Sequence, residues 1–335
     1  IVAAALIEAG LPSQAMDATR LIVTDENFGE ATPQMETTRL NTRQVLLPLL
    51  EKGIVPVVTG FIGATVEGVI TTLGRGGSDY SSALLGNCLD SDEIWIWTDV
   101  NGVLSADPRV VPQAHTLPTV SYNEAAEMAY FGAKVLHPKT MLPAMEKGIP
   151  IRTLNSFEPQ HPGTLVALND KNGQGKQATI RAITTIKDLA QITVEGHGMM
   201  GVPGVAARVF SAVAQEDVSV LMISQASSEQ SICFVIRQPE AARAIAALER
   251  AFERELARRN VDRIWAQENV AIVAAVGSGL RSVPGIAGKL FGALGQRGIN
   301  IISIAQGSSE YNLSLVVRQD EAYEAVRAIH QDFEL

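Results

Sequence analysis

The sequence has little cysteine: only Cys88 and Cys233 occur among its 335 residues, and they lie far apart. The five histidines are equally scattered, and neither residue type has the short, regular spacing of a metal-binding motif. The simplest interpretation is two reduced thiols in a cytosolic protein. His115, in a polar loop, and His137, before a proline, are expected to be structural, and no cluster of metal ligands is predicted.

Positive charge is also scarce, since 27 Lys and Arg stand against 36 Asp and Glu, for a net charge of −9. The acidic excess lies in the first half: residues 1–167 hold 10 basic and 18 acidic side chains, whereas residues 168–335 hold 17 and 18. This balance disfavours non-specific binding to nucleic acid. An anionic ligand in the acidic half must therefore be held by locally placed cations or by a metal ion.

No apolar run is long and continuous enough to predict a membrane span. The most apolar stretch, residues 54–73, is interrupted by turn-forming and charged residues, namely Pro56, Gly60, Gly63, Glu67 and Gly68. Two buried strands around a turn account for it better. The sequence also has no signal-peptide pattern. We therefore expect a cytoplasmic protein with no membrane partner.

The residues that are abundant fit a folded α/β protein: 46% are hydrophobic, 19% are charged and 28 are glycine. A chain of this length predicts two or three domains. The first half alternates strand-like and helix-like segments. The strands are expected at 54–60, 68–73, 93–98 and 149–154, and the helices at 38–52, 79–89 and 122–130. This alternation predicts a mostly parallel sheet with helices on both faces, with ligands at the carboxyl ends of its strands.

The most informative stretch is residues 71–83, which combine a strand end, a glycine-rich turn and a helix start. Glycines let the backbone approach a ligand closely, and amide groups at a helix N-terminus favour anions. Arg75 adds a planar fork of donors that suits a carboxylate or a phosphate. We expect Ser78 or Asp79 to cap the helix that follows. The stretch therefore predicts a site for an anionic small molecule.

The second half of the sequence repeats itself. Val202-Pro203-Gly204 recurs 81 positions later as Val283-Pro284-Gly285, and the same offset relates Gln225 to Gln306. An offset shared by many positions indicates a duplicated module.

We place a first domain at residues 1–168 and a linker at 169–180, because residues 169–177 contain no apolar side chain. The two modules then occupy residues 181–262 and 263–335.

Each module is predicted to run strand, helix, strand, strand, helix, a small α+β sandwich of the split βαβ type. The modules hold no nucleophile–base pair and no metal cluster. Their Pro-Gly turns suit a small zwitterionic ligand, with a plain dimer scaffold as the alternative. Residues 221–224 and 301–304 are expected at sheet edges. Pairing with a second copy would hide those edges, so we predict a homodimer formed through the modules.

Several motifs, in order along the chain, resemble those of the aspartokinases, members of the amino-acid kinase superfamily. Leu73-Gly74-Arg75-Gly76-Gly77-Ser78-Asp79-Tyr80-Ser81 is similar to the family signature, and Thr59-Gly60-Phe61-Ile62-Gly63 also matches. Trp97-Thr98-Asp99-Val100-Asn101-Gly102-Val103, followed by Asp107-Pro108-Arg109, resembles the nucleotide loop. Phe131-Gly132-Ala133-Lys134-Val135-Leu136-His137-Pro138 resembles the second nucleotide segment. The duplicated modules resemble paired ACT regulatory domains. The resemblance covers essentially the whole chain and implies an amino-acid kinase sheet followed by two ferredoxin-like ACT modules.

The resemblance implies transfer of the γ-phosphoryl group of ATP to the β-carboxylate of L-aspartate, the first step toward lysine, threonine and methionine. Such a transfer depends on positioning and charge neutralisation, and the attacking carboxylate needs no general base. The residues implied to hold aspartate are Arg75, Gly76, Gly77 and Ser78, while Asp79 would organise the site through a lysine or Mg²⁺. The residues implied to contact ATP are Thr98, Asp99, Leu104, Arg109, Lys134 and Val135. Leu104 replaces the aromatic residue common at its position.

The sequence departs from the family at its start, where the N-terminal strand and the Lys-Phe-Gly-Gly-Thr-Ser loop are absent. The glutamate segment that helps to hold aspartate is absent as well. The chain begins at Ile1 with a helix pattern that has no N-cap residue, which predicts missing upstream sequence and little turnover by residues 1–335 alone.

Two other interpretations stay open. One is a different amino-acid kinase, acting on carbamate, glutamate or uridylate, which the ACT-like modules disfavour. The other is a non-catalytic amino-acid sensor. The upstream reading frame separates enzyme from sensor, because an intact lysine loop would mark an enzyme fragment and a start codon near Ile1 would favour the sensor.

The expected effector site lies in the repeated modules, where Gln225 and Gln306 each follow a strand. A glutamine side chain can donate to a carboxylate and accept from an ammonium or hydroxyl group. The surrounding segments resemble those of threonine-sensitive aspartokinases, including enzymes fused to homoserine dehydrogenase. Threonine is therefore expected ahead of lysine as feedback inhibitor, in a homodimer or homotetramer. The alternative is that both glutamines only cap strand ends.

Overall fold

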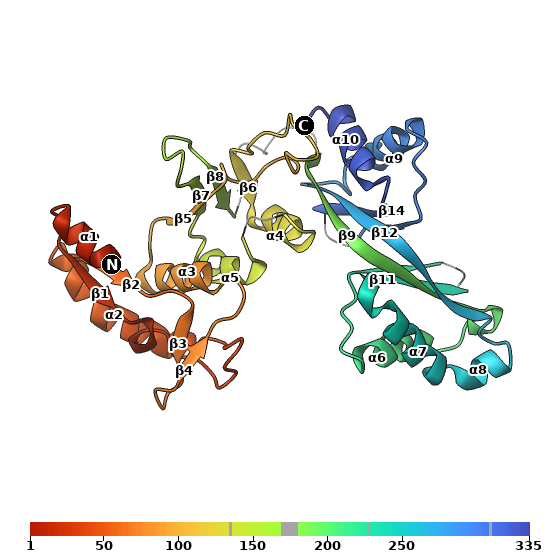
Figure 1. The fold of residues 1–335 in the computed structure, drawn as a ribbon, viewed down its shortest axis with the longest axis horizontal. Helices are drawn as coiled ribbons and strands as arrows, with labels where there is room; N and C mark the ends of the chain where they lie inside the picture. Colours follow the sequence, from red (N-terminus) through yellow and green to blue (C-terminus); the bar gives the residue numbers. More distant parts are fainter. Residues whose placement is uncertain (134–135, 169–179, 227, 229, 308–309) are drawn as a thin grey trace. The chain divides into compact units, whose positions relative to one another are not determined.

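The computed structural model describes residues 1–133, 136–168, 180–226, 228, 230–307 and 310–335. Its packing divides the chain into two compact units (Figure 1). The first unit comprises residues 1–104, 116–130 and 134–176. The second comprises residues 105–115, 131–133 and 177–335. Two short segments from the first half of the sequence therefore belong to the unit built mainly from the second half.

The first unit alternates helices and short strands, as its sequence predicts. Its helices are α1 (Val2–Glu8), α2 (Met35–Glu51), α3 (Gly77–Leu89), α4 (Tyr122–Tyr130) and α5 (Pro138–Lys147), with a 3₁₀ turn at Ala18–Arg20. Its strands are β1 (Ser13–Met16), β2 (Val55–Val58), β3 (Ile62–Ala64), β4 (Ile70–Thr72), β5 (Ile94–Thr98), β6 (Thr119–Ser121), β7 (Ile151–Asn155) and β8 (Thr164–Ala167).

The strands of the first unit pair mostly in parallel, but in three separate sheets rather than one. The pairs β1–β2, β5–β7 and β6–β8 are parallel, whereas β3–β4 and β7–β8 are antiparallel. The α/β fold class is confirmed. A single parallel sheet would place the turn after β4 and the loop after β5 at the same edge. In the structure they follow strands of different sheets. Sequence periodicity indicates where a strand lies but not which strand it pairs with. The division into three sheets was therefore not predicted.

Helix α5 was not predicted from the sequence, although its signals are present. Pro138 occupies the first helical position and Gly148 follows the last one in a left-handed conformation with φ 67°. Asn87 of α3, which is fully buried, donates to the carbonyl oxygen of Pro143 at 2.7 Å and accepts from Nη2 of Arg39 at 2.8 Å. Asn87 thereby ties α3, the helix that follows the glycine-rich turn, to α2 and α5.

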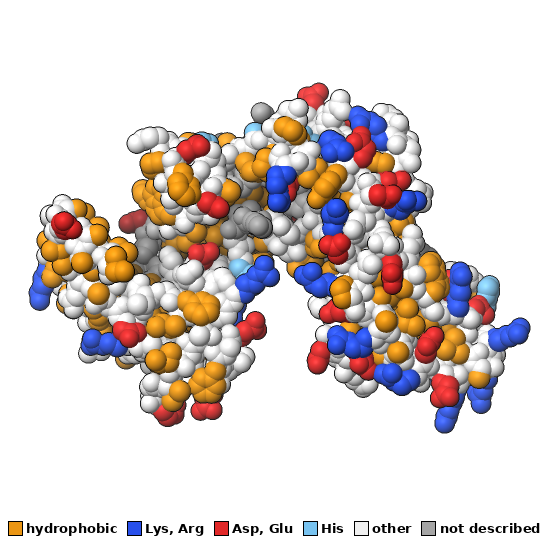
Figure 2. All heavy atoms as spheres, in the orientation of Figure 1, with side chains coloured by type: hydrophobic (Ala, Val, Ile, Leu, Met, Phe, Trp, Pro, Cys, Tyr) orange, Lys and Arg blue, Asp and Glu red, His pale blue; other side chains and the backbone are white. Residues whose placement is uncertain are grey.

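The second unit contains the duplicated module. Its strands are β9 (Ile180–Glu195), β10 (Met222–Gln225), β11 (Ser231–Arg237), β12 (Arg263–Gly277), β13 (Ser303–Ala305) and β14 (Asn312–Arg318). Its helices are α6 (Val205–Ala214), α7 (Ala241–Ala251), α8 (Glu253–Ala257), α9 (Ile286–Gln296) and α10 (Ala322–Asp332). The strands form one six-stranded antiparallel sheet in the order β10-β11-β9-β12-β14-β13, shared by both modules. In Figure 2 acidic and basic side chains are interspersed over this unit.

The modules exchange parts of their two longest strands, β9 and β12, which run side by side in Figure 1. Ile183, in the first half of β9, packs in the core beneath α9 and α10, with Leu290 and Ile329. Ile264, in the first half of β12, packs in the core beneath α6 and α7. The repeat predicts a boundary between residues 262 and 263. Ile264 and Ala266 lie beyond that boundary, yet they pack against the core of the first module.

Each exchanged strand bends where it passes from one module to the other. Asp188 in β9 and Asn269 in β12 have φ values of 60° and 56°, and they stand 81 positions apart. Left-handed backbone is uncommon outside glycine, and Asp and Asn adopt it most easily among the other residues. The bends are thus repeat-related features of the two modules.

The sheet has a second face, opposite the helices, with its own buried cluster. The cluster, called here the second-face cluster, includes no residue of α6–α10 and consists of Phe131, Leu189, Met222, Val235, Val270, Ile272, Ala274 and Val316. Strands β10 and β13 are the two outermost strands, as expected for residues 221–224 and 301–304. The sheet curls far enough for β10 and β13 to approach one another. Among the described residues no helix combines the length and apolar character needed to cross a membrane.

Candidate functional site

The glycine-rich turn between β4 and α3 begins the helix earlier than the sequence predicts. Gly76, with φ 72°, is the N-cap residue, and no side chain caps the helix. The expected capping by Ser78 or Asp79 is therefore wrong, since both lie within the first turn of α3. The left-handed glycine turns the chain directly into the helix, which leaves the first-turn amide groups available to a ligand.

Four chain segments meet tightly at this turn, and each contact involves a glycine. A Cβ on Gly77 would lie 2.7 Å from Cδ2 of Phe61, and one on Gly76 would lie 2.9 Å from Cβ of His137. A Cβ on Gly60 would lie 3.2 Å from Ser78, and one on Gly74 would lie 3.0 Å from Cγ of Glu30. The matched segment 59–63, the signature turn and the start of α5 are thus brought together. Glu30 is a neighbour that the sequence analysis did not single out, whereas His137 was expected to be structural.

Arg75 and Asp79 present opposite charges at this turn. Arg75 is exposed and makes no hydrogen bond or ion pair with another described residue. Asp79 is half-buried, and burial raises the pKa of its carboxyl, an effect partly offset by a hydrogen bond with Ser78. Burial is therefore the main influence on this carboxyl group, and it disfavours the charged form. The turn therefore offers a free guanidinium for an anion and a carboxylate that would be stabilised by an added cation.

The loop after β5 forms a second group of predicted site residues. Thr98 donates to the Asp99 carboxylate at 3.2 Å, and Asp99 itself is exposed. The loop is fixed from behind, because Asn101 accepts from Asn155 of β7 at 2.8 Å and Thr164 of β8 accepts from the backbone of Val103 at 2.8 Å. Asp99 is thus an exposed carboxylate on a well-anchored loop. The hydrogen bonds of this group are separate from the contacts around Gly76.

The remaining predicted ATP residues divide between the units. Leu104 is the last residue of its stretch in the first unit, and Arg109 belongs to the second. The Arg109 side chain is 81% exposed and forms an ion pair with Asp107 at 2.6 Å. The hydrogen-bonded Asp107 carboxylate raises the pKa of Arg109 further above its ordinary value. Lys134 and Val135 lie outside the described residues.

Ser105 anchors the segment that carries Arg109 to the second unit. The serine is fully buried, and its Oγ lies 3.0 Å from Nε2 of His330 on α10 and 3.5 Å from Nδ1 of His115. Its carbonyl oxygen accepts from the backbone of Ile183 in β9 at 2.8 Å. Burial, and then the proximity of His115, lower the pKa of His330. The expectation that His115 is structural fits this arrangement.

The predicted effector residues lie at the sheet edges. Gln225 ends β10 and Gln306 follows β13, and both side chains are exposed. Neighbouring residues 227, 229, 308 and 309 are outside the described part of the chain, so the repeated Ser-Ser-Glu segments are only partly visible.

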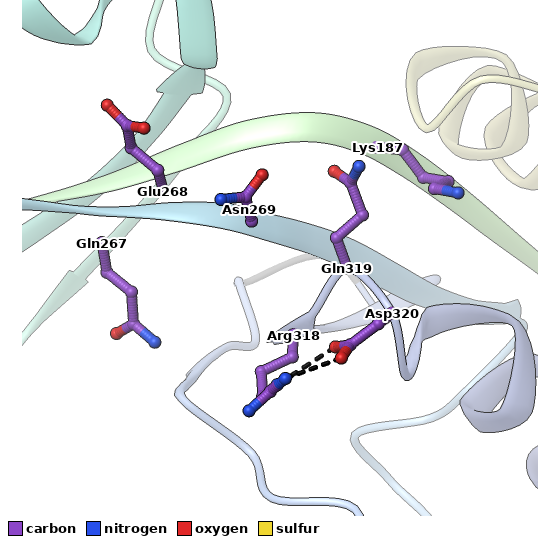
Figure 3. Close-up of a pocket in the computed structure, with 7 residues that line it drawn as sticks. All are labelled: Lys187, Gln267, Glu268, Asn269, Arg318, Gln319 and Asp320. Carbon is purple, nitrogen blue, oxygen red and sulfur yellow. Dashed lines mark hydrogen bonds and ion pairs between the residues drawn. The ribbon is translucent and has the colours of Figure 1, made fainter.

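A pocket lies at the strand bends instead, and neither glutamine lines it (Figure 3). It encloses about 580 Å³ and is lined by polar residues, namely Lys187, Gln267, Glu268, Asn269, Arg318, Gln319 and Asp320. Its two cations are already engaged: Arg318 pairs with Asp320 at 2.6 Å, and Lys187 lies 4.3 Å from the ring centre of Tyr323. The pocket therefore marks the bend between the modules, and neither of the two cations that line it is unengaged in the way that Arg75 is.

No group of three or more metal-ligating side chains occurs among the described residues. A dedicated cage for a metal ion is therefore not formed by the visible part of the chain. Single carboxylates such as Asp79 and Asp99 suit a Mg²⁺ ion that arrives with phosphate oxygens, since protein-bound Mg²⁺ commonly uses one or two carboxylates together with substrate phosphates.

Comparison with known proteins identifies both halves of the chain. Residues 1–155 match the model of the amino acid kinase family, and residues 192–252 and 273–333 each match an ACT domain. The chain is 46% identical, over 278 residues, to the chloroplastic bifunctional aspartokinase/homoserine dehydrogenase 1 of Zea mays. That match covers 83% of this chain but only 30% of the maize protein.

Two further comparisons cover nearly the whole chain. It is 34% identical to lysine-sensitive aspartokinase 3 of Escherichia coli, over 98% of this chain and 71% of that protein. The crystal structure of E. coli aspartokinase III with aspartate and ADP, in its R-state, superposes with a TM-score of 0.78 at 32% identity. That superposition covers 98% of this chain and 72% of the crystallised one.

Proposed function

Because this chain belongs to the aspartokinase family, we propose that it carries the nucleotide-binding and regulatory parts of an enzyme that phosphorylates L-aspartate with ATP. Its relatives and structural neighbours are aspartate kinases. The chain spans about a third of the length of the bifunctional relatives that it matches. The reaction, its substrates and its partners are therefore proposals for the protein as a whole.

The free guanidinium of Arg75, beside the left-handed glycine that starts α3, is the observation that carries the proposal. We assign Arg75 to a carboxylate of aspartate, because its fork matches two carboxylate oxygens. Gly76, Gly77 and Ser78 supply backbone amides and a hydroxyl in the first helical turn. Asp79 organises the site by binding a cation, which would stabilise its half-buried carboxylate.

We assign ATP to the loop after β5 and to the segments that follow it. Thr98 and Asp99 lie on the anchored loop, Leu104 provides an apolar contact, and Arg109, Lys134 and Val135 complete the set. Arg109 must exchange its Asp107 partner for a phosphate. Mg²⁺ enters as part of the nucleotide complex and neutralises phosphate charge, the main requirement of phosphoryl transfer.

The test is trapping of aspartyl phosphate as its hydroxamate, with the natural full-length protein, ATP, Mg²⁺ and L-aspartate. Hydroxamate that depends on aspartate, and not on glutamate or carbamate, is the expected result. Phosphorylation of glutamate or carbamate in place of aspartate would refute the assignment. Calorimetric titration of residues 1–335 with ADP measures the nucleotide part alone.

We further propose threonine as the feedback inhibitor, with Gln225 and Gln306 as contacts in a homodimer or homotetramer. Both glutamines are exposed at the strand ends and can meet a ligand's carboxylate and ammonium groups. One E. coli relative is described as lysine-sensitive, so lysine is the direct competitor. Calorimetry with both amino acids, repeated on Gln225→Ala and Gln306→Ala, distinguishes them. Lysine binding alone, or threonine binding unaffected by both substitutions, contradicts the assignment.

The assembly and the cell compartment also need direct tests. Sedimentation at micromolar concentration measures the oligomeric state, and a monomer would count against dimerisation through the modules. We propose the cytoplasm as the compartment, although the relatives include chloroplastic enzymes as well as bacterial ones. Fractionation of the source cells tests this.

A further inference from the structure

Thr140, on helix α5, carries a hydroxyl group that lies buried beside the glycine-rich turn without a hydrogen-bond partner. The residue is fully buried, and its Oγ1 bonds to no residue that the structure describes. This Oγ1 would lie 3.5 Å from a Cβ on Gly76. A buried hydroxyl that has exchanged its bonds to water for none in the protein is unfavourable, and native proteins rarely keep one. Its place at the turn is therefore informative.

The N-termini of helices α3 and α5 meet at this turn, and the two helices pack side by side (Figure 1). Gly76 is the N-cap residue of α3, and His137 is the N-cap residue of α5. A Cβ on Gly76 would lie 2.9 Å from Cβ of His137, so the two caps lie against one another. The N-terminal ends of helices are positive and favour anions. Two such ends, together with the exposed Arg75, therefore make this turn suited to a carboxylate.

The hydroxyl of Thr140 does not use the partner that a helix commonly offers. A threonine in a helix can donate to the carbonyl three or four residues earlier. Thr140 is the third residue of α5, so those carbonyls belong to His137 and Leu136. The His137 carbonyl accepts from the backbone N–H of Thr140 at 2.8 Å, but neither carbonyl accepts from the hydroxyl. The hydroxyl lies near Gly76 instead.

One peptide group of the turn also lacks a partner. The carbonyl of Arg75 and the N–H of Gly76, which belong to the same peptide bond, make no hydrogen bond to a residue in the described part of the chain. The turn is otherwise closed, since the N–H of Gly77 donates to the carbonyl of Gly74 at 3.0 Å. The unpaired hydroxyl of Thr140 and the unpaired peptide group thus both adjoin Gly76.

We propose that Thr140 is a positioning residue for Arg75. When a carboxylate occupies the turn, the Thr140 hydroxyl bonds to the peptide group between Arg75 and Gly76 and so fixes the direction of the Arg75 side chain. A hydroxyl can serve either group, because it donates to a carbonyl and accepts from an N–H. Ligand binding then satisfies groups that are unpaired in the free turn. The inference rests on the proposed function, since the ligand is L-aspartate at the site assigned to Arg75.

Thr140→Val tests the hydroxyl, because valine keeps the shape of threonine and removes its polar group. In the ligand-free chain, loss of an unpaired buried hydroxyl should raise the melting temperature by about 2–4 °C. In the natural full-length protein, the same change should raise the KM for L-aspartate at least about fivefold and leave the KM for ATP within about twofold. A structural role alone predicts no such division between the two substrates. Thr140→Ser keeps the hydroxyl and should hold the KM for aspartate within about twofold of the wild-type value.

Thr153, on strand β7, is the matched control. It is as buried as Thr140, and its Oγ1 also has no partner among the described residues, but its neighbours are strands β5 and β8 rather than the turn. Thr153→Val should therefore raise the melting temperature in the same way and change neither KM. If Thr140→Val does not fold, a comparison of Thr140→Ser with Thr140→Ala isolates the hydroxyl, because both lack the γ-methyl group.

A double-mutant cycle shows whether Thr140 acts through Arg75. The quantity measured is kcat/KM for L-aspartate in the full-length wild type, Thr140→Val, Arg75→Ala and the double variant. If the hydroxyl only orients the guanidinium group, Thr140→Val should lower kcat/KM in the wild type but by less than about twofold once Arg75 is replaced. Losses that add would mean that the two side chains act independently.

The outcomes separate this inference from the proposed function. An unchanged KM for aspartate in Thr140→Val, an equal rise in Thr153→Val, or additive losses in the cycle each overturn the inference, while aspartyl hydroxamate formed by the wild-type protein leaves the proposed function standing. A wild-type protein that forms no aspartate-dependent hydroxamate contradicts the proposed function and, with it, the inference. A KM that rises in Thr140→Val, is kept in Thr140→Ser and is unaffected in Thr153→Val supports the inference.

Discussion

Gln319 holds the bend of strand β9 through two hydrogen bonds to Asp188. Its Oε1 accepts from the Asp188 backbone N–H at 2.7 Å, and its Nε2 donates to the Asp188 carboxylate at 3.0 Å. Gln238, 81 positions before Gln319, makes the equivalent contact to the other bend and accepts from the backbone N–H of Asn269 at 3.2 Å. The repeat therefore extends to the side chains that stabilise the exchanged strands.

We predict that Gln319→Ala lowers the free energy of unfolding by about 1 kcal/mol or slightly more, the usual net value of the hydrogen bonds it removes. Gln238→Ala should cost less, because it removes one longer bond. Urea unfolding measures both. Gln215→Ala is the matched control, since that glutamine is exposed at the end of α6. Equal effects for Gln215→Ala and Gln319→Ala would contradict the prediction.

The left-handed bend itself can be tested at Asn269. Asn269→Ala should destabilise the protein by about 1 kcal/mol. The left-handed φ of 56° is unfavourable for alanine, which lacks the short polar group with which asparagine can hydrogen-bond locally. Asn269→Gly should be close to neutral, since glycine tolerates this conformation. Denaturant midpoints decide the order. A protein in which alanine is tolerated better than glycine would show that the bend is not strained.

At the glycine-rich turn, Gly76→Ala is expected to cost about 1–3 kcal/mol of stability and to abolish most activity. The new Cβ would sit at φ 72° and 2.9 Å from Cβ of His137, so the start of α3 or of α5 must move. Thermal melting and hydroxamate formation report the two effects. Gly29→Ala is the control, because a Cβ there meets nothing within 4 Å and the backbone is not left-handed. Full activity in Gly76→Ala would rule out a tight turn at the site.

Replacement of Arg75 by alanine should lower kcat/KM by an amount equivalent to about 2–4 kcal/mol of transition-state binding free energy. The free energy of unfolding should change little. The guanidinium is exposed and unpaired among the described residues, so its removal breaks no structural contact. Arg75→Lys should recover only part of the loss, because an ammonium group lacks the planar fork. Arg20→Ala, an exposed arginine outside the motif, controls for charge. Unchanged kcat/KM in Arg75→Ala would remove Arg75 from the site.

Stability should decrease as the pH falls below about 6.5, in part because of His330. Burial among Ser105, His115 and α10 lowers its pKa from 6.5, so in this window the unfolded chain binds a proton that the folded chain does not. His330→Gln keeps a polar partner for Ser105 and should make the dependence shallower. We propose urea midpoints between pH 7.5 and 5.5, and equal slopes for both proteins would exclude His330 as a source.

The sequence alone determined the local features of this protein. Its motifs placed Arg75 on a turn between a strand and a helix, and the offset of 81 identified two modules with their element order. These features are readable because periodicity reports which side of an element is buried, and because glycine and proline report where the chain must turn. The site residues themselves, Arg75, Asp79 and Asp99 among them, stay predictions.

The tertiary structure decided which buried faces meet. The repeat pattern does not say that β9 and β12 exchange halves at Asp188 and Asn269, because an apolar strand face can pack in either module. Likewise Phe131 and Ser105 look like ordinary core residues of the first half, yet both pack in the second unit, Ser105 against His330 at a separation of 225 positions. Hydrophobic burial is not directional, so the sequence fixes how much surface an element must hide, whereas only the folded chain selects its partner.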